Sequence, residues 1–377
     1  SDLSDPEMES AMAMVHQRYS TNTFPAWALA HPFRFIAHNG EINSLRGNLN
    51  WLKSREALFA SRKFGKHIHK LLPIVRPGSS DSAALDSVVE LLYHAGRSLP
   101  HCIMMLIPEA WQRHDTMPDA KRAFYEYHAC SLEPWDGPAT VPFSDGRVIG
   151  AVLDRNGLRP SRYTLTHDGL VVLASETGVL PIAPERVKLK GRLRPGRMFL
   201  ADLEAGRIIE DEEIKAAVSG RQPYRRWLTD NLVTMEGLAR ETAHAAPAEE
   251  STSSLAAWQR LLLYGYTQED LKMLLPPMAT EGKEAVGSMG DDIPPAILSR
   301  KSRLLYDYFK QLFAQVTNPP LDAIREELVT SLNTYLGTEG NLLDESPAHC
   351  RRLKLESPVL SADQMALLRG LDRPGLR

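Results

Sequence analysis

Hydrophobic residues in the first part of the chain recur with helical spacing. In SSDSAALDSVVELLYHAGRS (79–98), apolar residues lie three and four positions apart, which predicts an amphipathic helix with Ser80 or Asp81 as its N-cap. The apolar run FRFIAH (33–38) is predicted to be a buried strand. A helix is predicted to follow it and to be interrupted at Gly47.

Strand-like runs alternate with tight turns from residue 137 onward. The turns SDG (144–146) and HDG (167–169) separate runs such as RVIGAVLD and LVVLASE, which is typical of an antiparallel meander. From about residue 225 the pattern becomes helical again. This order of elements predicts an α+β fold that is followed by the start of a second domain.

A stretch of low hydrophobicity suggests where the two domains meet. ARETAHAAPAEESTSS (239–254) is rich in Ala, Ser, Glu and Pro, a composition typical of linkers. We therefore expect a first domain over 1–238 and a second over 255–377.

The overall charge argues against two classes of partner. The 377 residues carry a formal net charge of -3, whereas nucleic-acid and membrane-surface binders usually have a basic excess. No apolar run reaches the roughly 18 residues that a membrane span needs. The polar N-terminus does not resemble a signal peptide, so we expect a cytoplasmic protein, or a plastid one in a photosynthetic eukaryote.

The three cysteines give no sign of a metal centre. Cys102, Cys130 and Cys350 are far apart and form no CxxC pair. This spacing favours reduced, buried thiols, so we expect neither a metal ion nor an iron–sulfur cluster in this chain.

Two short segments carry charged groups suited to an amino-acid ligand. Arg18 lies beside Ser and Thr in HQRYSTNT, and a guanidinium is a two-pronged donor for a carboxylate. Asp81, in PGSSDSAAL, stands at the start of the predicted helix and could bind an ammonium group. Each also has an ordinary explanation, because Arg18 could be a surface residue and Asp81 a simple N-cap.

Two further segments place polar groups in loops. In AHNGEIN, the Asn39 amide and the Gly40 N–H could donate to one oxyanion, although Asn-Gly after a strand is also a common turn. LDRNGLRPSRY (153–163) is a charged loop between strands, which its spacing predicts to be a turn with an Arg–Asp network.

These segments together, in this order, resemble the glutaminase domain of glutamate synthase. The resemblance is carried by HQRYSTNTFPAW, FRFIAHNGEINSLRGNLNW, PGSSDSAALD, LIPEAWQ, YEYHACSLEPWDGPA and GAVLDRNGLRPSRY. The shorter pieces RYST, AHNG, SDS and RNGLRP resemble class II glutamine amidotransferases at large. Later runs, among them YGYTQEDLKMLLPPMA and YLGTEGNLL, resemble the central domain of glutamate synthase.

The resemblance implies a fold and a set of residue roles. The fold would be the N-terminal-nucleophile hydrolase αββα four-layer sandwich, here incomplete, followed by part of an α/β central domain. Arg18 would bind the α-carboxylate of L-glutamine and Asp81 its α-ammonium. Asn39 and Gly40 would form the oxyanion hole, while a cysteine at the mature N-terminus would attack the amide.

The same resemblance implies parts that the chain does not contain. Only 15 residues precede His16 and the first is Ser1, so we expect the segment with the nucleophilic cysteine to be missing. The parent enzyme would also use FMN and an iron–sulfur cluster, both held beyond Arg377. It would pass ammonia to 2-oxoglutarate, with electrons from a small subunit or ferredoxin; NADPH and NADH stay open as sources.

Two other functions remain open at this stage. Ser1 could itself be an N-terminal nucleophile, although SDLSDPEM does not resemble the buried strand that such a nucleophile begins. The chain could instead be a non-catalytic module that binds glutamine or another amino acid. That alternative predicts affinity that depends on Arg18 and Asp81, without turnover.

Overall fold

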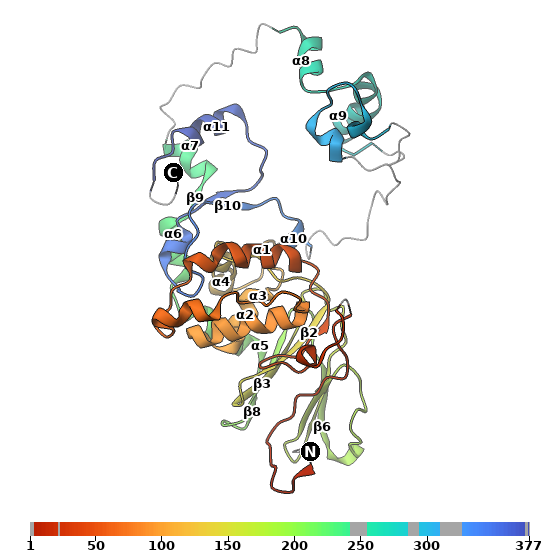
Figure 1. Cartoon of the computed structure of the whole chain (residues 1–377), viewed down its shortest axis with the longest axis vertical. Coiled ribbons are helices and arrows are strands. Elements are labelled where there is room, and N and C mark those ends of the chain that lie inside the picture. Colours follow the sequence, from red (N-terminus) through yellow and green to blue (C-terminus); the bar gives the residue numbers. More distant parts are fainter. Residues whose placement is uncertain are drawn as a thin grey trace. The chain divides into compact units, whose positions relative to one another are not determined.

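The computed structural model forms two compact units (Figure 1). The first unit joins Ser1–His244 with Ala323–Arg377, so a late segment of the chain packs with the early part. The second unit is Ala245–Asp322. The structure describes residues 4–21, 23–241, 255–285, 294–309, 326–373 and 376.

A five-stranded antiparallel sheet, in the order β1-β2-β3-β7-β8, forms one layer of the first unit. The turn predicted at SDG joins its second and third strands, and Gly146 has a φ of 90° there. The antiparallel pairing at this turn is confirmed, but the single meander predicted from residue 137 onward is wrong, because β3 pairs with β7 and the hairpin around HDG belongs to a second sheet. The strands are β1 Asn39–Gly40, β2 Ala139–Ser144, β3 Val148–Leu153, β7 Met198–Asp202 and β8 Arg207–Ile209.

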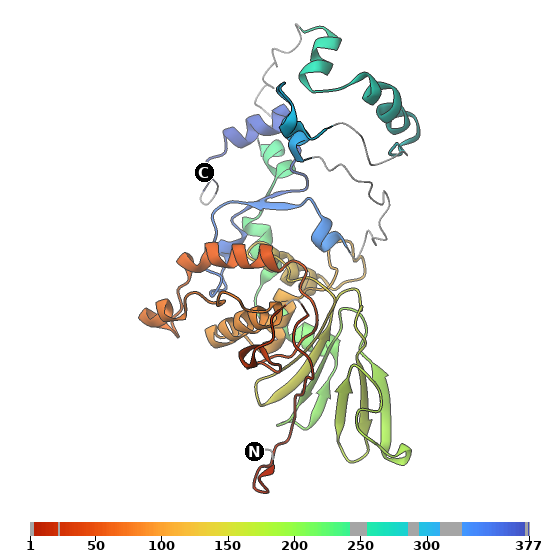
Figure 2. The same ribbon diagram turned by 45° about the vertical axis from the view of Figure 1, so that its right-hand side comes forward.

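A second antiparallel sheet, β5-β4-β6, packs on one face of the first (Figure 2). Its strands are β4 Arg162–Thr166, β5 Val171–Ala174 and β6 Val187–Arg192. Successive side chains of β3 point to opposite faces, as in any strand. Leu153 therefore joins a small core with Phe199 and Tyr163 between the sheets, whereas Val152 faces the helices.

Helices cover the other face of the five-stranded sheet. The apolar sides of α2, α3 and α4 share one core with β2, β3 and β7, and this core includes Val88, Ile103, Phe124 and Phe143, each fully buried. The helices of the first unit before residue 245 are α1 Leu45–Arg55, α2 Asp81–Ala95, α3 Leu99–Leu106, α4 Asp119–Ala129, α5 Asp211–Ser219, α6 Tyr224–Asn231 and α7 Met235–Glu241.

The late segment of the first unit is tied to these helices by buried polar contacts. The Arg55 guanidinium, 3% exposed, donates to Glu133 at 2.5 and 2.7 Å and to Glu339 at 2.8 Å. Arg97 donates to the carbonyl oxygen of Leu342 at 2.9 Å. This segment contributes α10 Glu327–Thr330, α11 Ala362–Arg369 and two strands, β10 Thr334–Leu336 and β11 Leu353–Leu355, which form a small sheet with β9 Val233–Thr234.

The described part of the second unit contains two short helices, α8 Ala257–Leu263 and α9 Leu275–Glu281, and a π-helical turn at Asp270–Leu274. No helix among the described residues of the chain combines the length and apolar character that crossing a bilayer requires.

The α+β prediction is confirmed, and two further local predictions are wrong. The helix α1 runs through Gly47 without interruption. Over 33–38 only Ile36 makes a bridge, to Phe143, because the N–H groups of residues 34–36 donate to Asp86 instead of a neighbouring strand. The layers described are helices, sheet and sheet, so the complete αββα sandwich remains a prediction.

The predicted domain limits cannot be compared directly with the two units. Most of the predicted linker 239–254 lies outside the described residues, as does Ser1. The limits 1–238 and 255–377 therefore stay predictions.

Candidate functional site

The candidate site is built around the first turn of α2. Ser80 is the N-cap, as predicted, because its Oγ accepts the Ala83 N–H at 3.0 Å. Asp81 is therefore freed from the capping role and is the first helical residue. A carboxylate at this end of a helix is stabilised by the positive end of the helix dipole.

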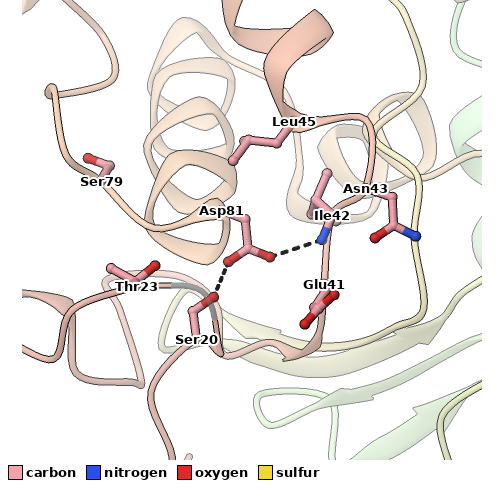
Figure 3. Close-up of a pocket in the computed structure, with 8 residues that line it drawn as sticks. All are labelled: Ser20, Thr23, Glu41, Ile42, Asn43, Leu45, Ser79 and Asp81. Atoms are coloured by element: carbon pink, nitrogen blue, oxygen red, sulfur yellow. Dashed lines mark hydrogen bonds between the residues drawn. The ribbon is translucent and has the colours of Figure 1, made fainter. Parts of the chain in front are cut away.

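Asp81 connects three segments that are distant in the sequence (Figure 3). Its carboxylate accepts a short hydrogen bond from the Ser20 hydroxyl and another, 2.9 Å long, from the Ile42 N–H. Ser20 belongs to the N-terminal segment and Ile42 to the loop after β1. The helix start, this loop and the N-terminal segment thus converge on one side chain.

A cavity of about 310 Å³ opens beside this carboxylate. That volume lies at the lower end of the roughly 300–1,000 Å³ typical of small-molecule sites. Asp81 and Ser20 contribute to a mainly polar wall (Figure 3). The residues that line the cavity are Ser20, Thr23, Glu41, Ile42, Asn43, Leu45, Ser79 and Asp81.

Asp81 is ionised at neutral pH despite its partial burial. Burial by itself would raise the pKa of the carboxyl, but hydrogen bonds from Ser20 and Ile42 outweigh it, so the net pKa is below the usual value. A negative charge therefore stands at the cavity wall. Such a group can accept hydrogen bonds from an ammonium ion.

Asn39 and Gly40 form the short strand β1 immediately before the cavity-lining loop. Ala37 donates its N–H to Pro142 of β2 at 3.0 Å, and Glu41 donates to Pro138, immediately before β2, at 2.9 Å. Because N–H directions alternate along a strand, the Gly40 N–H points away from β2. Neither residue lines the cavity itself.

Gly40 occupies a place that no other residue can take. Its φ is 150°, and a Cβ added there would lie 1.7 Å from the Pro138 carbonyl oxygen. The strand that leads to the cavity therefore approaches β2 more closely than a side chain would allow.

Arg18 lies two residues before Ser20 and is exposed. No hydrogen bond or ion pair joins its guanidinium to another described residue, although its carbonyl oxygen lies 3.1 Å from His31 Nδ1. Of the four residues predicted for the site, Asp81 alone lines the cavity, and Arg18, Asn39 and Gly40 lie within two residues of its lining. Their binding roles stay predictions.

Several contributors were missed by the sequence reasoning. His38 is fully buried behind Asp81, with Nδ1 2.8 Å from the Ser82 Oγ and 3.8 Å from the Asp81 Oδ2. Asp86 lies further along α2 and binds the N–H groups of residues 34–36. A carboxylate on the buried stripe of SAALDSVVELL was a signal that could have been used, because a buried charge needs partners.

The charged loop after β3 has the predicted turn and Arg–Asp network. Asp154 accepts the N–H groups of Asn156 and Leu158, which forms the turn. The Arg155 guanidinium, which is buried, donates to Asp136 at 2.8 and 3.0 Å and to Glu326 at 2.9 Å. This loop supports the fold and does not line the cavity.

One group of described residues places possible metal ligands close together, namely His101, His128 and Glu345. The two histidine Nε2 atoms are 3.1 Å apart, and the Tyr224 hydroxyl donates to Glu345. Burial, and to a smaller extent Arg97, lowers the pKa of His101 to about 3. The His101 Nδ1 is buried without a partner among the described residues, but the positive guanidinium of Arg97 lies nearby, so we assign no cation to this group.

Cys102 and Cys130 are poor metal ligands and poor nucleophiles. Burial raises the pKa of the Cys102 thiol to about 12. A hydrogen bond with Cys350, followed by burial, raises the pKa of Cys130 well above its usual value. Cluster ligation and nucleophilic attack both require the thiolate, so we assign neither role to these two thiols.

Comparison with known families gives two matches along the chain. Residues 1–227 match the family described as "Glutamine amidotransferases class-II". Residues 259–376 match the family described as "Glutamate synthase central domain".

Several similar proteins align with nearly the whole chain, and their names give different electron donors. The chain is 51% identical to "Glutamate synthase [NADPH] large chain" of Bacillus subtilis, over 100% of this chain and 24% of that protein. It is 50% identical to "Glutamate synthase [NADH]" of Schizosaccharomyces pombe, over 99% of this chain and 18% of that protein. It is 47% identical to "Ferredoxin-dependent glutamate synthase" of Pyropia yezoensis, over 97% of this chain and 23% of that protein. The chain thus spans about a quarter or less of these relatives.

Proposed function

Because the chain belongs to the class-II glutamine amidotransferases, in the amidotransferase and central-domain region of glutamate synthase, we propose that its cavity binds L-glutamine. The observation that carries the proposal is the ionised Asp81 carboxylate at the cavity wall. It would accept hydrogen bonds from the α-ammonium group of the ligand.

The other predicted residues complete the recognition of glutamine. Arg18 is exposed close to Ser20 and has no partner among the described residues, so its guanidinium is available to an α-carboxylate. Asn39 and the Gly40 N–H would donate to the oxyanion that forms when the amide is attacked. Donors of this kind act in the transition state, and losing one typically costs about 10²–10³ in kcat.

The chemistry of the intact protein follows from this assignment. A cysteine thiolate outside the described residues would attack the amide carbon, ammonia would leave, and water would release glutamate from the thioester. Support comes from the helix–sheet–sheet layers, which we propose are part of an αββα N-terminal-nucleophile fold. The alternative nucleophile, Ser1, lies outside the described residues.

We further propose that the intact protein is a glutamate synthase. The released ammonia would be transferred to 2-oxoglutarate, and FMN and an iron–sulfur cluster would supply electrons. Electron donation by NADPH, NADH or ferredoxin is consistent with the names of the relatives. The described residues of this chain offer no fitting cluster ligands, so no step of that chemistry is assigned to them.

Glutamine binding to the chain tests the proposal directly. Isothermal titration calorimetry should detect L-glutamine, and Asp81→Asn or Arg18→Ala should each weaken binding about 10- to 100-fold, as expected for hydrogen bonds to charged groups. Arg46→Ala is the matched control, because Arg46 is exposed on α1 and does not line the cavity. Equal affinity in all four proteins would refute the proposal.

A further inference from the structure

Asp81 is held from behind by a chain of two buried side chains. His38 is 2% exposed, and its Nδ1 lies 2.8 Å from the Ser82 Oγ. The Ser82 Oγ lies in turn 3.3 Å from the Asp81 Oδ1. None of these contacts involves the cavity-facing residues Ser20 and Ile42, which bind the same carboxylate from other directions.

The direction of each hydrogen bond follows from the inventory of protons. An ionised carboxylate only accepts, so Ser82 must donate its one hydroxyl proton to Asp81. The Ser82 oxygen then accepts from His38, which places the histidine proton on Nδ1. The His38 Nε2 is buried and has no partner among the described residues, so a proton there would be an unpaired donor.

The same burial keeps the histidine neutral. Desolvation lowers the pKa of His38 to about 4, even though Asp81 acts in the opposite direction. At neutral pH the chain is therefore His38 Nδ1–H to Ser82 O–H to the Asp81 carboxylate. The relay delivers an oriented hydrogen bond and adds no positive charge that would neutralise Asp81.

Building on the proposed function, we infer that His38 and Ser82 are positioning residues that orient Asp81 toward the α-ammonium group of the ligand. Ser20 and Ser82 donate to Oδ1, and the Ile42 N–H donates to Oδ2, so the plane of the carboxylate is fixed. Asp81 lines the cavity, and one acceptor site is left on Oδ2 for an ammonium group there. Without the relay, Asp81 would keep its charge, but Oδ1 would keep only the Ser20 donor and the carboxylate would be less firmly oriented.

Comparing two ligands distinguishes a change in the orientation of Asp81 from a general loss of protein structure. L-glutamine and glutaramate differ only in the α-ammonium group, which glutaramate lacks. We define the ratio as the dissociation constant of glutaramate divided by that of L-glutamine. This ratio reports recognition of the α-ammonium group alone, and it does not depend on the fraction of protein that is folded. A purely structural role for His38 would weaken both ligands alike and leave the ratio unchanged.

The experiment measures this ratio by calorimetry for the full chain, for Asp81→Asn and for four further variants. His38→Asn keeps a donor near the position of Nδ1, whereas His38→Gln moves it towards the position of Nε2. Ser82→Ala removes the relay, and Ser87→Ala is the matched control, because the Ser87 Oγ bonds within α2 to the Ala83 carbonyl. We expect His38→Gln and Ser82→Ala to lower the ratio about tenfold, and His38→Asn and Ser87→Ala to change it less than about twofold.

The outcomes separate this inference from the proposed function. If the unmodified chain prefers glutamine and Asp81→Asn abolishes the preference, but Ser82→Ala and His38→Gln retain it, the relay has no positioning role. If the unmodified chain does not prefer glutamine over glutaramate at all, the proposed function fails first. The relay would be supported if the ratio of dissociation constants falls tenfold in both Ser82→Ala and His38→Gln but stays near that of the unmodified chain in His38→Asn.

Discussion

At this site, the conformation or ionisation state of a single residue is set by its neighbours in the fold. Gly40 faces the Pro138 carbonyl at a distance that excludes a Cβ, and Asp81 stays ionised because Ser20 and Ile42 donate to it. His38 stays neutral because it is buried. Substitutions at this scale should therefore have effects that depend on the neighbour that each residue meets.

Replacing Gly40 by alanine should destabilise the protein severely, by about 3 kcal/mol or more, because the new methyl group would collide with backbone and cannot move away. Gly47→Ala is the matched control, since nothing lies within 4 Å of a Cβ there and the residue is helical. That change should stabilise by about 0.5–1 kcal/mol. Urea unfolding of both variants checks the prediction, and a fully stable Gly40→Ala protein would contradict it.

His38 should make stability fall as the pH is lowered from 7 to 5. Its pKa is 6.5 when unfolded and about 4 when folded, so within this window the unfolded chain binds more protons, and stability is lost as pH falls. Asp81 contributes very little there, because its pKa is 3.8 in the unfolded chain and lower in the folded protein, which is below this pH window. Between pH 7 and pH 5, the free energy of unfolding of the His38→Asn variant should therefore fall by about 2 kcal/mol less than that of the unmodified chain.

Urea unfolding at the two pH values measures this difference. Other buried histidines, such as His31 with a pKa lowered by burial to about 4, have the same sign, so both proteins should lose stability at pH 5. Identical losses in the two proteins would show that His38 titrates normally in the folded state.

At the scale of elements, α2 holds the segment before the cavity at two points. Asp81 binds the Ile42 N–H at one end, and Asp86, one and a half turns later, binds the N–H groups of residues 34–36. The segment between them includes β1. The helix thus fixes the position of Asn39 and Gly40, immediately before the loop that lines the cavity.

Asp86→Ala should loosen this attachment and destabilise the protein by about 2–3 kcal/mol, because it leaves buried N–H groups at residues 35 and 36 without acceptors. The control is Asp168→Ala, whose ion pair with Arg186 is largely exposed, so its loss should change the melting temperature much less. Thermal unfolding of the two variants compares them, and equal melting temperatures would contradict the prediction.

The sequence predicted elements well where local pattern decides and poorly where a distant partner decides. The helix α2, its start at Ser80 or Asp81 and the two hairpins at SDG and HDG follow from spacing and turn residues, whereas the assignment of the hairpins to two sheets does not. The run 33–38 is apolar enough for a strand, but Asp86, about 50 residues away, takes its N–H groups. The contributions of His38 and Ser82 likewise depend on contacts that spacing does not reveal.

At the scale of the whole molecule, the amidotransferase part and a late segment of the chain form one unit. Arg55 and Arg97 join helices near the sheet to residues beyond 335, and Arg155 joins the loop after β3 to Glu326. Breaking a buried ion pair of this kind typically costs about 3–5 kcal/mol. The region that resembles the central domain is therefore part of the support for the site.

The most direct test of the account is a crystal structure of the chain with L-glutamate, which shares the α-amino-acid end of glutamine. We expect the ligand in the cavity, with its ammonium within hydrogen-bond distance of Asp81 and its α-carboxylate on the Arg18 guanidinium. Glutamate bound elsewhere, or an empty cavity at saturating ligand, would contradict the central claim that Asp81 marks a glutamine site.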